Sequence, residues 1–338
     1  MGVKGLTITS ARLNYECLLG LRFGLSPGFL ILPHSCYTPK MLGKLEYLIA
    51  LAREKNFGRA AEACGVTQPS FSAGIRALED AMGMPLVNRS SRFQGFTPEG
   101  EAMLEWARRI TGDVHAMRED VSRLKRGLTG VLRIGAIPTA LAVVAELTTP
   151  YRAQHPNVRF QIFSCTSSEV LERLNNLEID AGLTYLDNEP IGKARIFTLY
   201  EERYRLLTSS SAPLGDRESV SWAEVGKIPL CLLTADMQNR RIIDRLLREA
   251  GVKAEPTLES NSIVVLVSHV QTGRWASVMP EKLAEIFGLT TRLRAIPITN
   301  PHEVHSVGLV VPDRAPLSPL TEALIVQAMR LKPLSPTT

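Results

Sequence analysis

The chain has 338 residues, of which 45% are apolar and 22% are charged. That length is sufficient for two or three domains with their own cores, and no apolar run is long enough to cross a bilayer. The formal net charge is +5, but residues 1–40 contribute +3 of it, and the rest of the chain carries 35 basic and 33 acidic side chains. Bulk charge therefore does not by itself indicate a nucleic-acid partner.

The cysteine pattern argues against a secreted, disulfide-stabilised protein. Five cysteines are present, an odd number, with no CxxC pair and no metal-ligand spacing. This usage is typical of a reducing cytoplasm and predicts a cytoplasmic protein without a metal or other cofactor.

Residues 1–40 differ in character from the rest of the chain. Their hydrophobic pieces are broken by Arg22, Pro27 and Pro33. A signal peptide is one reading, but Arg22 interrupts its apolar segment. We predict instead that Met41 is the natural start and that residues 1–40 are a disordered or non-native extension.

The segment 57–80 predicts two short helices joined by a tight turn. Phe57, Ala60, Ala61 and Cys64 follow the i, i+3, i+4, i+7 spacing of one apolar helix face. A glycine follows, as at many helix ends. Thr67 then has the chemistry of an N-cap, with a proline in the first turn of the second helix.

The second helix has two distinct faces. The inner face consists of Phe71, Ile75, Leu78 and Met82. The opposite face is small and polar, which permits close approach to base pairs; Gln can pair with adenine, and Arg with guanine or a phosphate. A helical hairpin with a solvated outer face is the alternative, but the joint pattern favours DNA binding. The predicted DNA-binding residues here are Gln68, Pro69, Ser70, Ser72 and Arg76.

A short segment after this helix predicts a β-hairpin wing. Residues 83–97 contain Gly and Ser, carry Arg89 and Arg92, and include no acid. Both arginines are predicted to reach phosphates or the neighbouring minor groove. Thr97 and Pro98 then predict the start of a new helix.

The run from Leu45 to Gly100 resembles the winged helix-turn-helix of the LysR-type transcriptional regulators. Val87 departs from the family pattern, which usually has Phe, and Gly58 stands where a capping Ser or Thr is common; we expect Gly58 to weaken one helix cap. The matching motifs are Ala60-Ala61, Gln68-Pro69-Ser70-Phe71-Ser72, Ile75-Arg76-Ala77-Leu78-Glu79, Leu86-Val87-Asn88-Arg89 and Thr97-Pro98-Glu99-Gly100.

A long helix is predicted from residue 98 to about residue 125. Ile110, Val114, Met117, Val121 and Leu124 have the a/d spacing of a coiled-coil seam. The helix could instead pack on its own domain, but the resemblance favours a dimerisation helix. Two recognition helices on one face would then read two half-sites.

From residue 131 onwards, strands alternate with helices, which predicts parallel α/β structure. This part resembles the periplasmic-binding-protein-like effector domain of the same family. The whole prediction is a mixed fold: an α-helical winged helix-turn-helix domain at 41–98, a linker or dimerisation helix at 99–128, and a two-lobed α/β effector domain at 129–335. Lobe I is assigned to about 129–200 and 302–335, and lobe II to about 201–301.

In open α/β lobes, ligands bind beyond the carboxyl ends of the strands, near helix N-termini. Polar residues at these positions suit a small carboxylate or oxyanion, although Ser and Thr are also ordinary N-caps. The run Asn239-Arg240-Arg241 could add charge, but a solvated helix face is the favoured reading. The predicted effector-binding residues are Thr139, Ser167, Ser168, Thr184, Thr234 and Gln238.

Two other classes of function fit the sequence less well. An enzyme is disfavoured because the α/β region shows no nucleophile elbow, phosphate loop, metal pattern or catalytic carboxylate pair. A purely architectural DNA-binding protein would not need an α/β module of this size. Some family members sense oxidants through paired cysteines; here Cys165 and Cys231 are far apart in sequence, and buried core thiols are the favoured reading.

We therefore predict a non-enzymatic, sequence-specific transcriptional regulator. Its predicted partners are double-stranded promoter DNA, further copies of itself in a homodimer or homotetramer, and a small-molecule effector between the lobes, an anion being one option. The resemblance adds RNA polymerase as a candidate partner; no membrane partner and no cofactor are predicted.

Overall fold

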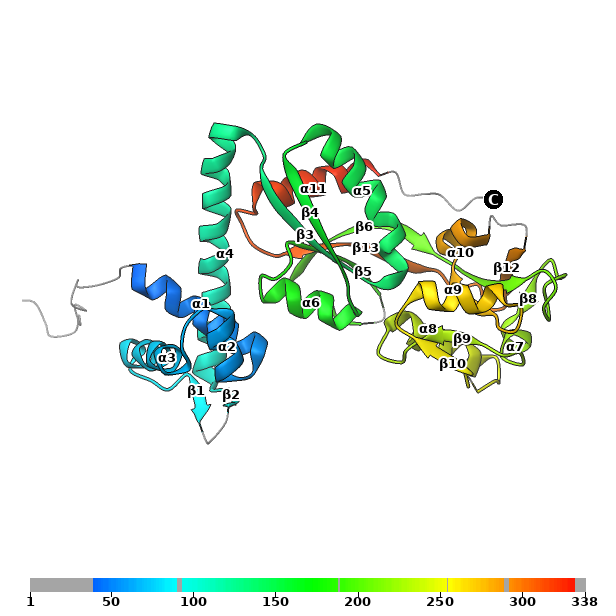
Figure 1. Ribbon diagram of the computed structural model, residues 1–338, viewed down its shortest axis with the longest axis horizontal. Coiled ribbons are helices and arrows are strands. Elements are labelled where there is room, and N and C mark those ends of the chain that lie inside the picture. The colour runs from blue at the N-terminus through cyan, green and yellow to red at the C-terminus, as the bar shows by residue number, and fades with distance from the viewer. Residues whose placement is uncertain (1–38, 90–92, 188, 254, 289–291, 332–338) are drawn as a thin grey trace, which may run out of the picture. The chain divides into compact units, whose positions relative to one another are not determined.

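The computed structural model describes residues 39–331 except 90–92, 188, 254 and 289–291. The predicted extension thus lies outside the described residues, apart from its last two positions at the start of the first helix. The N-terminal part comprises α1 (Pro39–Glu54), α2 (Phe57–Ala63), α3 (Gln68–Met82), β1 (Val87–Arg89), β2 (Phe93–Phe96) and α4 (Pro98–Arg126), as Figure 1 shows. The two predicted short helices, the hairpin and the long helix are confirmed.

The apolar faces of the first three helices meet in one small core. Phe71 and Ile75 of α3 are fully buried there, together with Leu48 of α1 and Ala60 of α2. The Tyr47 ring stacks on Phe71 with their centroids 4.8 Å apart. This periodic packing leaves the opposite face of α3 toward solvent.

Side-chain caps begin these helices, with one difference from expectation. Thr67 caps α3, and Thr97 caps α4 by accepting a hydrogen bond from the Gly100 N–H at 2.9 Å. The expectation that Gly58 weakens a cap is wrong. Asn56, two positions upstream, caps α2 and accepts from the Arg59 N–H at 3.0 Å.

The start of the wing is held to α3 and α4 by backbone hydrogen bonds at Leu86 and Val87. The Glu79 carboxylate of α3 accepts hydrogen bonds from the N–H groups of Leu86 and Val87 at 3.0 and 3.2 Å. The Leu86 carbonyl accepts from the Thr97 N–H at 3.0 Å. A Cβ on Gly100 would lie 1.9 Å from the Leu86 carbonyl oxygen, so only glycine allows this approach.

Lobe I is a five-stranded sheet with helices on both faces. Its strand order is β4-β3-β5-β13-β6; the first three strands are mutually parallel, and β13 is antiparallel to both its neighbours. Helices α5 and α11 cover one face and α6 covers the other (Figure 1). The elements are β3 (Gly130–Ala136), a 3-10 turn at Pro138–Ala140, α5 (Leu141–Gln154), β4 (Val158–Ser164), α6 (Ser167–Asn175), β5 (Ala181–Tyr185), β6 (Ala194–Glu202), β13 (His305–Pro312) and α11 (Pro319–Arg330).

Lobe II contains a four-stranded sheet ordered β11-β7-β12-β8 and a parallel pair, β10-β9. A bridge between Leu230 and Ala276 connects the pair to the β11 side. The elements are β7 (Tyr204–Ser209), β8 (Val220–Ser221), α7 (Trp222–Val225), β9 (Cys231–Leu233), α8 (Gln238–Glu249), β10 (Leu258–Ser260), α9 (Ile263–Gln271), β11 (Ser277–Pro280), α10 (Glu281–Gly288) and β12 (Leu293–Thr299).

The prediction of parallel α/β structure, which came from the three strand–helix units that end at Thr184, is confirmed for β4, β3 and β5, whereas several other strands are antiparallel. Strand β13 is antiparallel to β6 and β5, and β7 is antiparallel to β11 and β12. The reason is connectivity. Strand β6 carries the chain out of lobe I and β13 brings it back, so the two neighbours must run in opposite directions.

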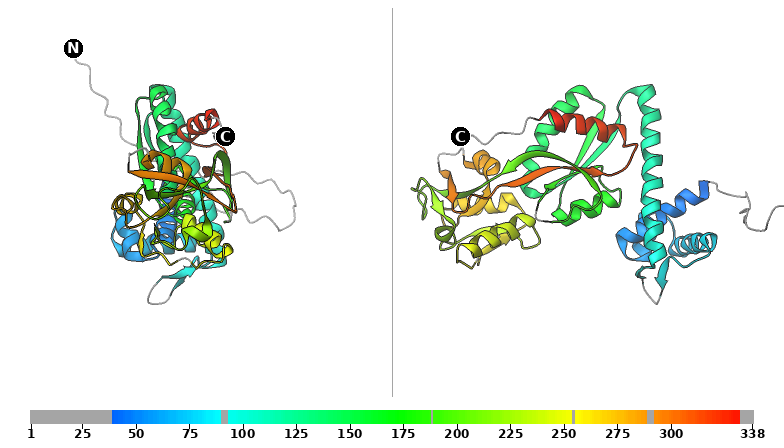
Figure 2. Two further views of the ribbon diagram at one scale, coloured as in Figure 1. Left: turned by 90° about the vertical axis from the view of Figure 1, so that its right-hand side faces the viewer. Right: turned by 180° about the vertical axis from the view of Figure 1, so that it is seen from behind.

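The chain passes between the lobes at two nearby points. Strand β6 ends at Glu202 and β7 begins at Tyr204, while β12 ends at Thr299 and β13 begins at His305. Figure 2 shows β6 and β13 side by side in the view from behind. One cluster of buried apolar residues extends through both lobes, and each lobe also has a smaller buried cluster of its own.

We expect Gly100→Ala to destabilise the DNA-binding part by about 1–3 kcal/mol, because the new methyl group overlaps a backbone oxygen that cannot move without disturbing the wing. Gly43→Ala is the matched control. A Cβ there meets nothing within 4 Å in the middle of α1, so alanine should be neutral or stabilising by about 0.5–1 kcal/mol. Urea unfolding of the two variants measures the difference; equal stabilities would contradict the role assigned to Gly100.

Candidate functional site

The outer face of α3 offers polar side chains without internal partners. Gln68, Pro69, Ser70 and Arg76 are exposed, and Ser72 is half-buried. The side chains of Gln68 and Arg76 make no hydrogen bond or ion pair to another described residue, which leaves their donors available to a ligand. The Ser70 hydroxyl instead accepts a hydrogen bond from the Thr67 hydroxyl at 3.0 Å, so it belongs to the cap of the helix.

The wing follows α3 as an antiparallel hairpin. Strand β1 carries Arg89, whose backbone pairs with Phe93 of β2. The Asn88 side chain donates to the Phe96 carbonyl at 3.0 Å and supports the hairpin. Arg92, the second predicted arginine of the wing, lies outside the described residues.

Helix α4 carries an exposed apolar stripe. Large apolar side chains recur on it at helical spacing and are 40 to 79% exposed, while Leu104, Ala107 and Ala116 are buried. A contiguous apolar stripe of this size on an exposed helix marks an interaction surface. The stripe consists of Trp106, Ile110, Met117, Val121 and Leu124; Val114, also predicted for the seam, is half-buried.

A cleft of about 730 Å³ lies between the lobes. Lobe I contributes Pro138, Leu141 and Thr166 to its wall, from the ends of β3 and β4 and the helices that follow. Lobe II contributes Met237 and the first turn of α9. The volume is within the range of about 300–1,000 Å³ that is usual for small-molecule sites.

Three of the six predicted effector residues have buried hydroxyl groups. Thr139, Thr184 and Thr234 each have a buried hydroxyl with no hydrogen-bond partner among the described residues. Native structures rarely leave such groups unpaired, so a water molecule or a ligand is the expected partner. Thr139 directly follows Pro138 in the cleft wall.

The other three predicted residues already have partners in the protein. The Ser167 hydroxyl donates to Glu189 at 2.9 Å, and the Ser168 hydroxyl bonds to that of Thr166 at 3.1 Å. The Gln238 amide donates to the Asp187 carbonyl at 2.9 Å. None of the six lines the cleft itself; its walls include their chain neighbours Pro138, Thr166 and Met237.

The solvated helix face predicted for Asn239-Arg240-Arg241 is wrong for two of the three residues. Asn239 and Arg240 are only 4 and 6% exposed. Arg240 pairs with Asp244 at 2.7 Å and also with Glu259, and Arg241 pairs with Glu189. The start of α8 contacts lobe I, which sequence periodicity could not show.

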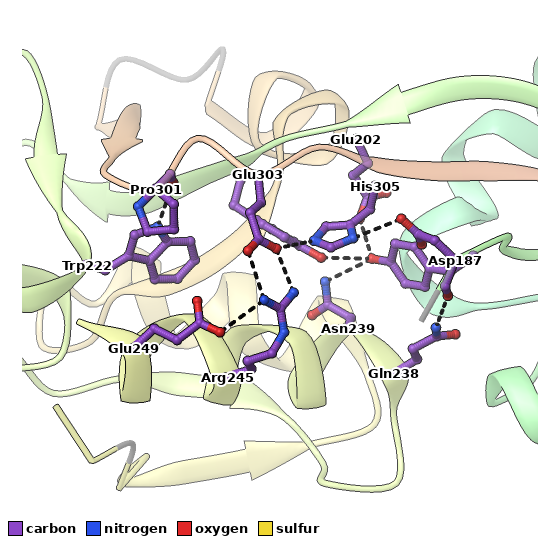
Figure 3. Close-up of polar contacts among 12 residues, drawn as sticks. Asp187, Glu202, Trp222, Gln238, Asn239, Arg245, Glu249, Pro301, Glu303 and His305 are labelled. Carbon is purple, nitrogen blue, oxygen red and sulfur yellow. Dashed lines mark hydrogen bonds and ion pairs between the residues drawn. The ribbon is translucent and has the colours of Figure 1, made fainter. Parts of the chain in front are cut away.

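A buried polar network surrounds the point where the chain crosses between the lobes (Figure 3). Glu202, at the end of β6, is 2% exposed and accepts hydrogen bonds from the Tyr185 hydroxyl and, at 3.5 Å, from the Tyr200 hydroxyl. The Asn239 amide of α8 donates to the Tyr185 hydroxyl at 3.2 Å. A lobe II helix is thus linked to a lobe I strand through one tyrosine.

The network continues along the returning strand. His305 lies 3.2 Å from Asp187 through Nδ1 and 3.4 Å from Glu303 through Nε2. Glu303 in turn receives two hydrogen bonds from Arg245 of α8, at 2.8 and 2.6 Å (Figure 3). Arg245 holds the pKa of Glu303 below its ordinary value.

Burial raises the pKa of Glu202 to about 8, although the hydrogen bonds from Tyr185 and Tyr200 oppose the shift. Desolvation penalises the charged carboxylate more than these two donors stabilise it. Glu202 is therefore largely protonated at neutral pH. Glu202 is not among the residues predicted from the sequence, where its signal is an acid placed between Tyr200 and Tyr204.

A winged helix-turn-helix followed by a two-lobed α/β module with a ligand-sized cleft defines a ligand-responsive DNA-binding regulator. Residues 42–101 match the family model described as bacterial regulatory helix-turn-helix protein, lysR family, and residues 125–330 match that of the LysR substrate binding domain. The chain belongs to the LysR family of transcriptional regulators. It is a DNA-binding regulator with an effector-binding domain and not an enzyme, as predicted.

Curated relatives include peroxide-responsive regulators. The chain is 29% identical to the hydrogen peroxide-inducible genes activator of Haemophilus influenzae, over 81% of this chain and 91% of the relative. It is 27% identical to OxyR of Escherichia coli, over 85% and 94% of the two chains.

Solved structures support the fold. A full-length OxyR variant from Pseudomonas aeruginosa superposes with a TM-score of 0.65 at 24% identity, covering 88% of this chain and 95% of that one. CbnR in complex with its target DNA gives a TM-score of 0.54 at 20% identity, covering 86% and 99%. In the described part of this chain, no helix has the length and apolarity to span a membrane.

We expect Glu202→Gln to reduce the loss of stability with rising pH. The pKa of Glu202 is about 8 in the folded protein, above its ordinary value of 4.5, so between these values the folded state holds a proton that the unfolded state has released. The stabilisation is complete below the unfolded pKa and is lost as pH rises through the folded pKa. Glutamine keeps the shape without titrating, so the decline between about pH 5 and pH 8 should become shallower.

Thermal unfolding midpoints across that pH range measure this effect. The exposed neighbour provides the control, since Glu201→Gln should leave the wild-type profile unchanged. A Glu202→Gln profile that parallels wild type would show that Glu202 does not titrate in this range.

Proposed function

We propose that this protein binds double-stranded promoter DNA as a homodimer or homotetramer and that a small molecule in the interlobe cleft controls its output. The cleft of about 730 Å³, with walls from both lobes, is the observation that carries the proposal. We assign residues 41–98 to DNA binding, 99–128 to the linker helix and 129–335 to effector binding. The proposed compartment is the cytoplasm, with RNA polymerase as a further partner and no cofactor.

The outer face of α3 supports the assignment of the DNA contacts. Gln68 and Arg76 are exposed and make no contacts that would compete with base edges or phosphates. The wing fastened at Leu86 supports a second contact beside the groove, through Arg89 and Arg92. CbnR, a structural relative, was solved with its target DNA.

The apolar stripe of α4 supports self-association. Trp106, Met117 and Leu124 are 57, 57 and 79% exposed, and water is an unfavourable neighbour for side chains of this size. A second copy of the same helix would cover them by coiled-coil packing. Dimerisation in turn places two copies of α3 at two half-sites.

The arrangement of the lobes supports control by a ligand. A molecule that contacts both walls of the cleft favours the separation of the lobes at which it fits best, and it can shift a conformational equilibrium only through such differential contacts. Such a shift would bend strands β6 and β13, which cross between the lobes, and would alter the hydrogen bonds around Glu202.

Oxidation of cysteine is the alternative trigger, since the curated relatives are named as peroxide-responsive activators. The described cysteines do not favour it. Cys64, Cys165 and Cys231 are free, burial raises the pKa of each thiol, and that of Cys231 rises to about 11. The thiolate is the form that reacts with peroxide, so these thiols are poorly suited to sensing it. Cys17 and Cys36 lie outside the described residues.

We expect Arg76→Ala to weaken promoter binding by about 5- to 150-fold, the range for loss of one good arginine contact to a base. Ser72→Glu should abolish binding, because it places a carboxylate against the phosphates. Arg152→Ala, an exposed change on α5, is the control and should have no effect. Retardation of a promoter fragment at fixed salt concentration measures all three; full affinity in both α3 variants would contradict the assigned recognition face.

We expect Val264→Trp to remove ligand-induced stabilisation. Val264 is 68% exposed in the cleft wall, so a larger side chain fills the cleft without entering the core. Val326→Trp on α11, where valine is 49% exposed, is the control. Thermal shifts across a panel of small metabolites measure binding. A metabolite that stabilises the Val264→Trp variant as strongly as wild type binds elsewhere, and its site would not be the cleft.

A further inference from the structure

The charged side chains that line the cleft, among the described residues, are all acidic. Among the described residues that line it, Glu169 and Asp236 are the acidic side chains, and there is no Arg, Lys or His. Most of the remaining wall is apolar, including Leu141, Val264 and Phe287. A buried or half-buried anion needs a compensating positive charge, which this wall does not provide.

The basic side chains adjacent to the wall are already paired. Arg241, near Asp236, forms an ion pair with Glu189. Lys282, next to Leu283 of the wall, lies 3.3 Å from Glu146 and over the Tyr200 ring at 4.8 Å from its centroid. Neither cation is free to neutralise an anionic ligand, and the surroundings of the cleft retain negative charge.

The helix N-terminus that would best hold an oxyanion is also occupied. At the start of α6, the Thr166 hydroxyl accepts from the Glu169 N–H at 3.1 Å, and the Glu169 carboxylate accepts from the Thr166 N–H at 2.8 Å. This capping box occupies the N–H groups of Thr166 and Glu169 and already places one carboxylate at the helix N-terminus. The N-termini of α8 and α9 have no side-chain cap hydrogen bond, so their N–H groups are available to an oxygen atom of a ligand.

One carboxylate of the wall remains for a ligand with hydrogen-bond donors. Asp236 is exposed, and its carboxylate has no partner among the described residues. A protonated amine can form a charged hydrogen bond with the carboxylate, and an apolar body can pack against the apolar side chains of the wall.

We propose that the cleft binds an apolar molecule carrying a protonated amine, and that Asp236 is its charge partner. This inference rests on the proposed function of the cleft as the effector site. This departs from the small carboxylate or oxyanion expected from the sequence. That expectation relied on hydroxyl groups at helix starts, whereas the cleft brings together acids and apolar side chains.

Three probes with the same apolar body and different head groups test the proposal on the full chain: 2-phenylethylamine, 2-phenylethanol and phenylacetate at pH 7. We expect the amine to raise the thermal midpoint and to bind at least about fivefold more tightly than the alcohol, with phenylacetate weakest. Asp236→Asn should bring the amine to the affinity of the alcohol. Asp216→Asn, an exposed aspartate in a lobe II loop, is the matched control and should bind like wild type.

Several outcomes would overturn the proposal: tighter binding of phenylacetate than of the amine, an amine affinity unchanged by Asp236→Asn, amine binding that survives Val264→Trp, or no binding of any probe. The proposed function fails differently. If phenylacetate binds and Val264→Trp removes it, the cleft remains the effector site and only the ligand class is wrong. Loss of promoter binding is measured separately, through the α3 variants.

Discussion

The effector domain depends on one constraint, that the chain must pass between its lobes twice at nearly the same place. Strands β6 and β13 run antiparallel through this point, and Glu202 lies buried where β6 ends. An ionised carboxylate there would be costly, so Glu202 stays largely protonated and is held by tyrosine hydroxyls. The same network reaches α8 through Asn239, so the helix and strands that set the lobe arrangement share one set of hydrogen bonds.

The DNA-binding part depends on the point where the wing meets α3 and α4, which is held by hydrogen bonds to the backbone. Leu86 is held by its backbone, through the Glu79 carboxylate on one side and the Thr97 N–H on the other, with Gly100 leaving room for its carbonyl. Backbone hydrogen bonds of this kind fix a strand without using side chains that could contact DNA. The residues of the family motifs thus divide into two groups: Gln68 and Arg76 point outward, while Glu79, Thr97 and Gly100 position the wing.

The cleft connects the two parts of the regulatory proposal. Its walls come from both lobes, so a ligand there acts on the lobe arrangement that the Glu202 network also stabilises. The proposed ligand is an apolar amine. That proposal rests on the acidic side chains of the cleft, on its apolar surface, and on the capping box at the N-terminus of α6. Among the described cysteines, Cys165 and Cys231 are buried and have raised pKa values, which favours this cleft over oxidation of these two thiols as the place where a signal enters.

The sequence by itself determined the local structure and the family. Helix periodicity, caps at Thr67 and Thr97 and the Gln68 to Glu79 motif are short-range signals, and they were sufficient to locate α2, α3, the wing and α4. Only the tertiary structure decided the direction of β13, the burial of Asn239 and Arg240, and the protonation of Glu202. Each of these depends on residues distant in sequence that meet after the chain has crossed between the lobes. The charge of the cleft also depends on the tertiary structure. Glu169 lies at a helix start in lobe I and Asp236 near one in lobe II, and only folding brings them to the wall of the same cleft.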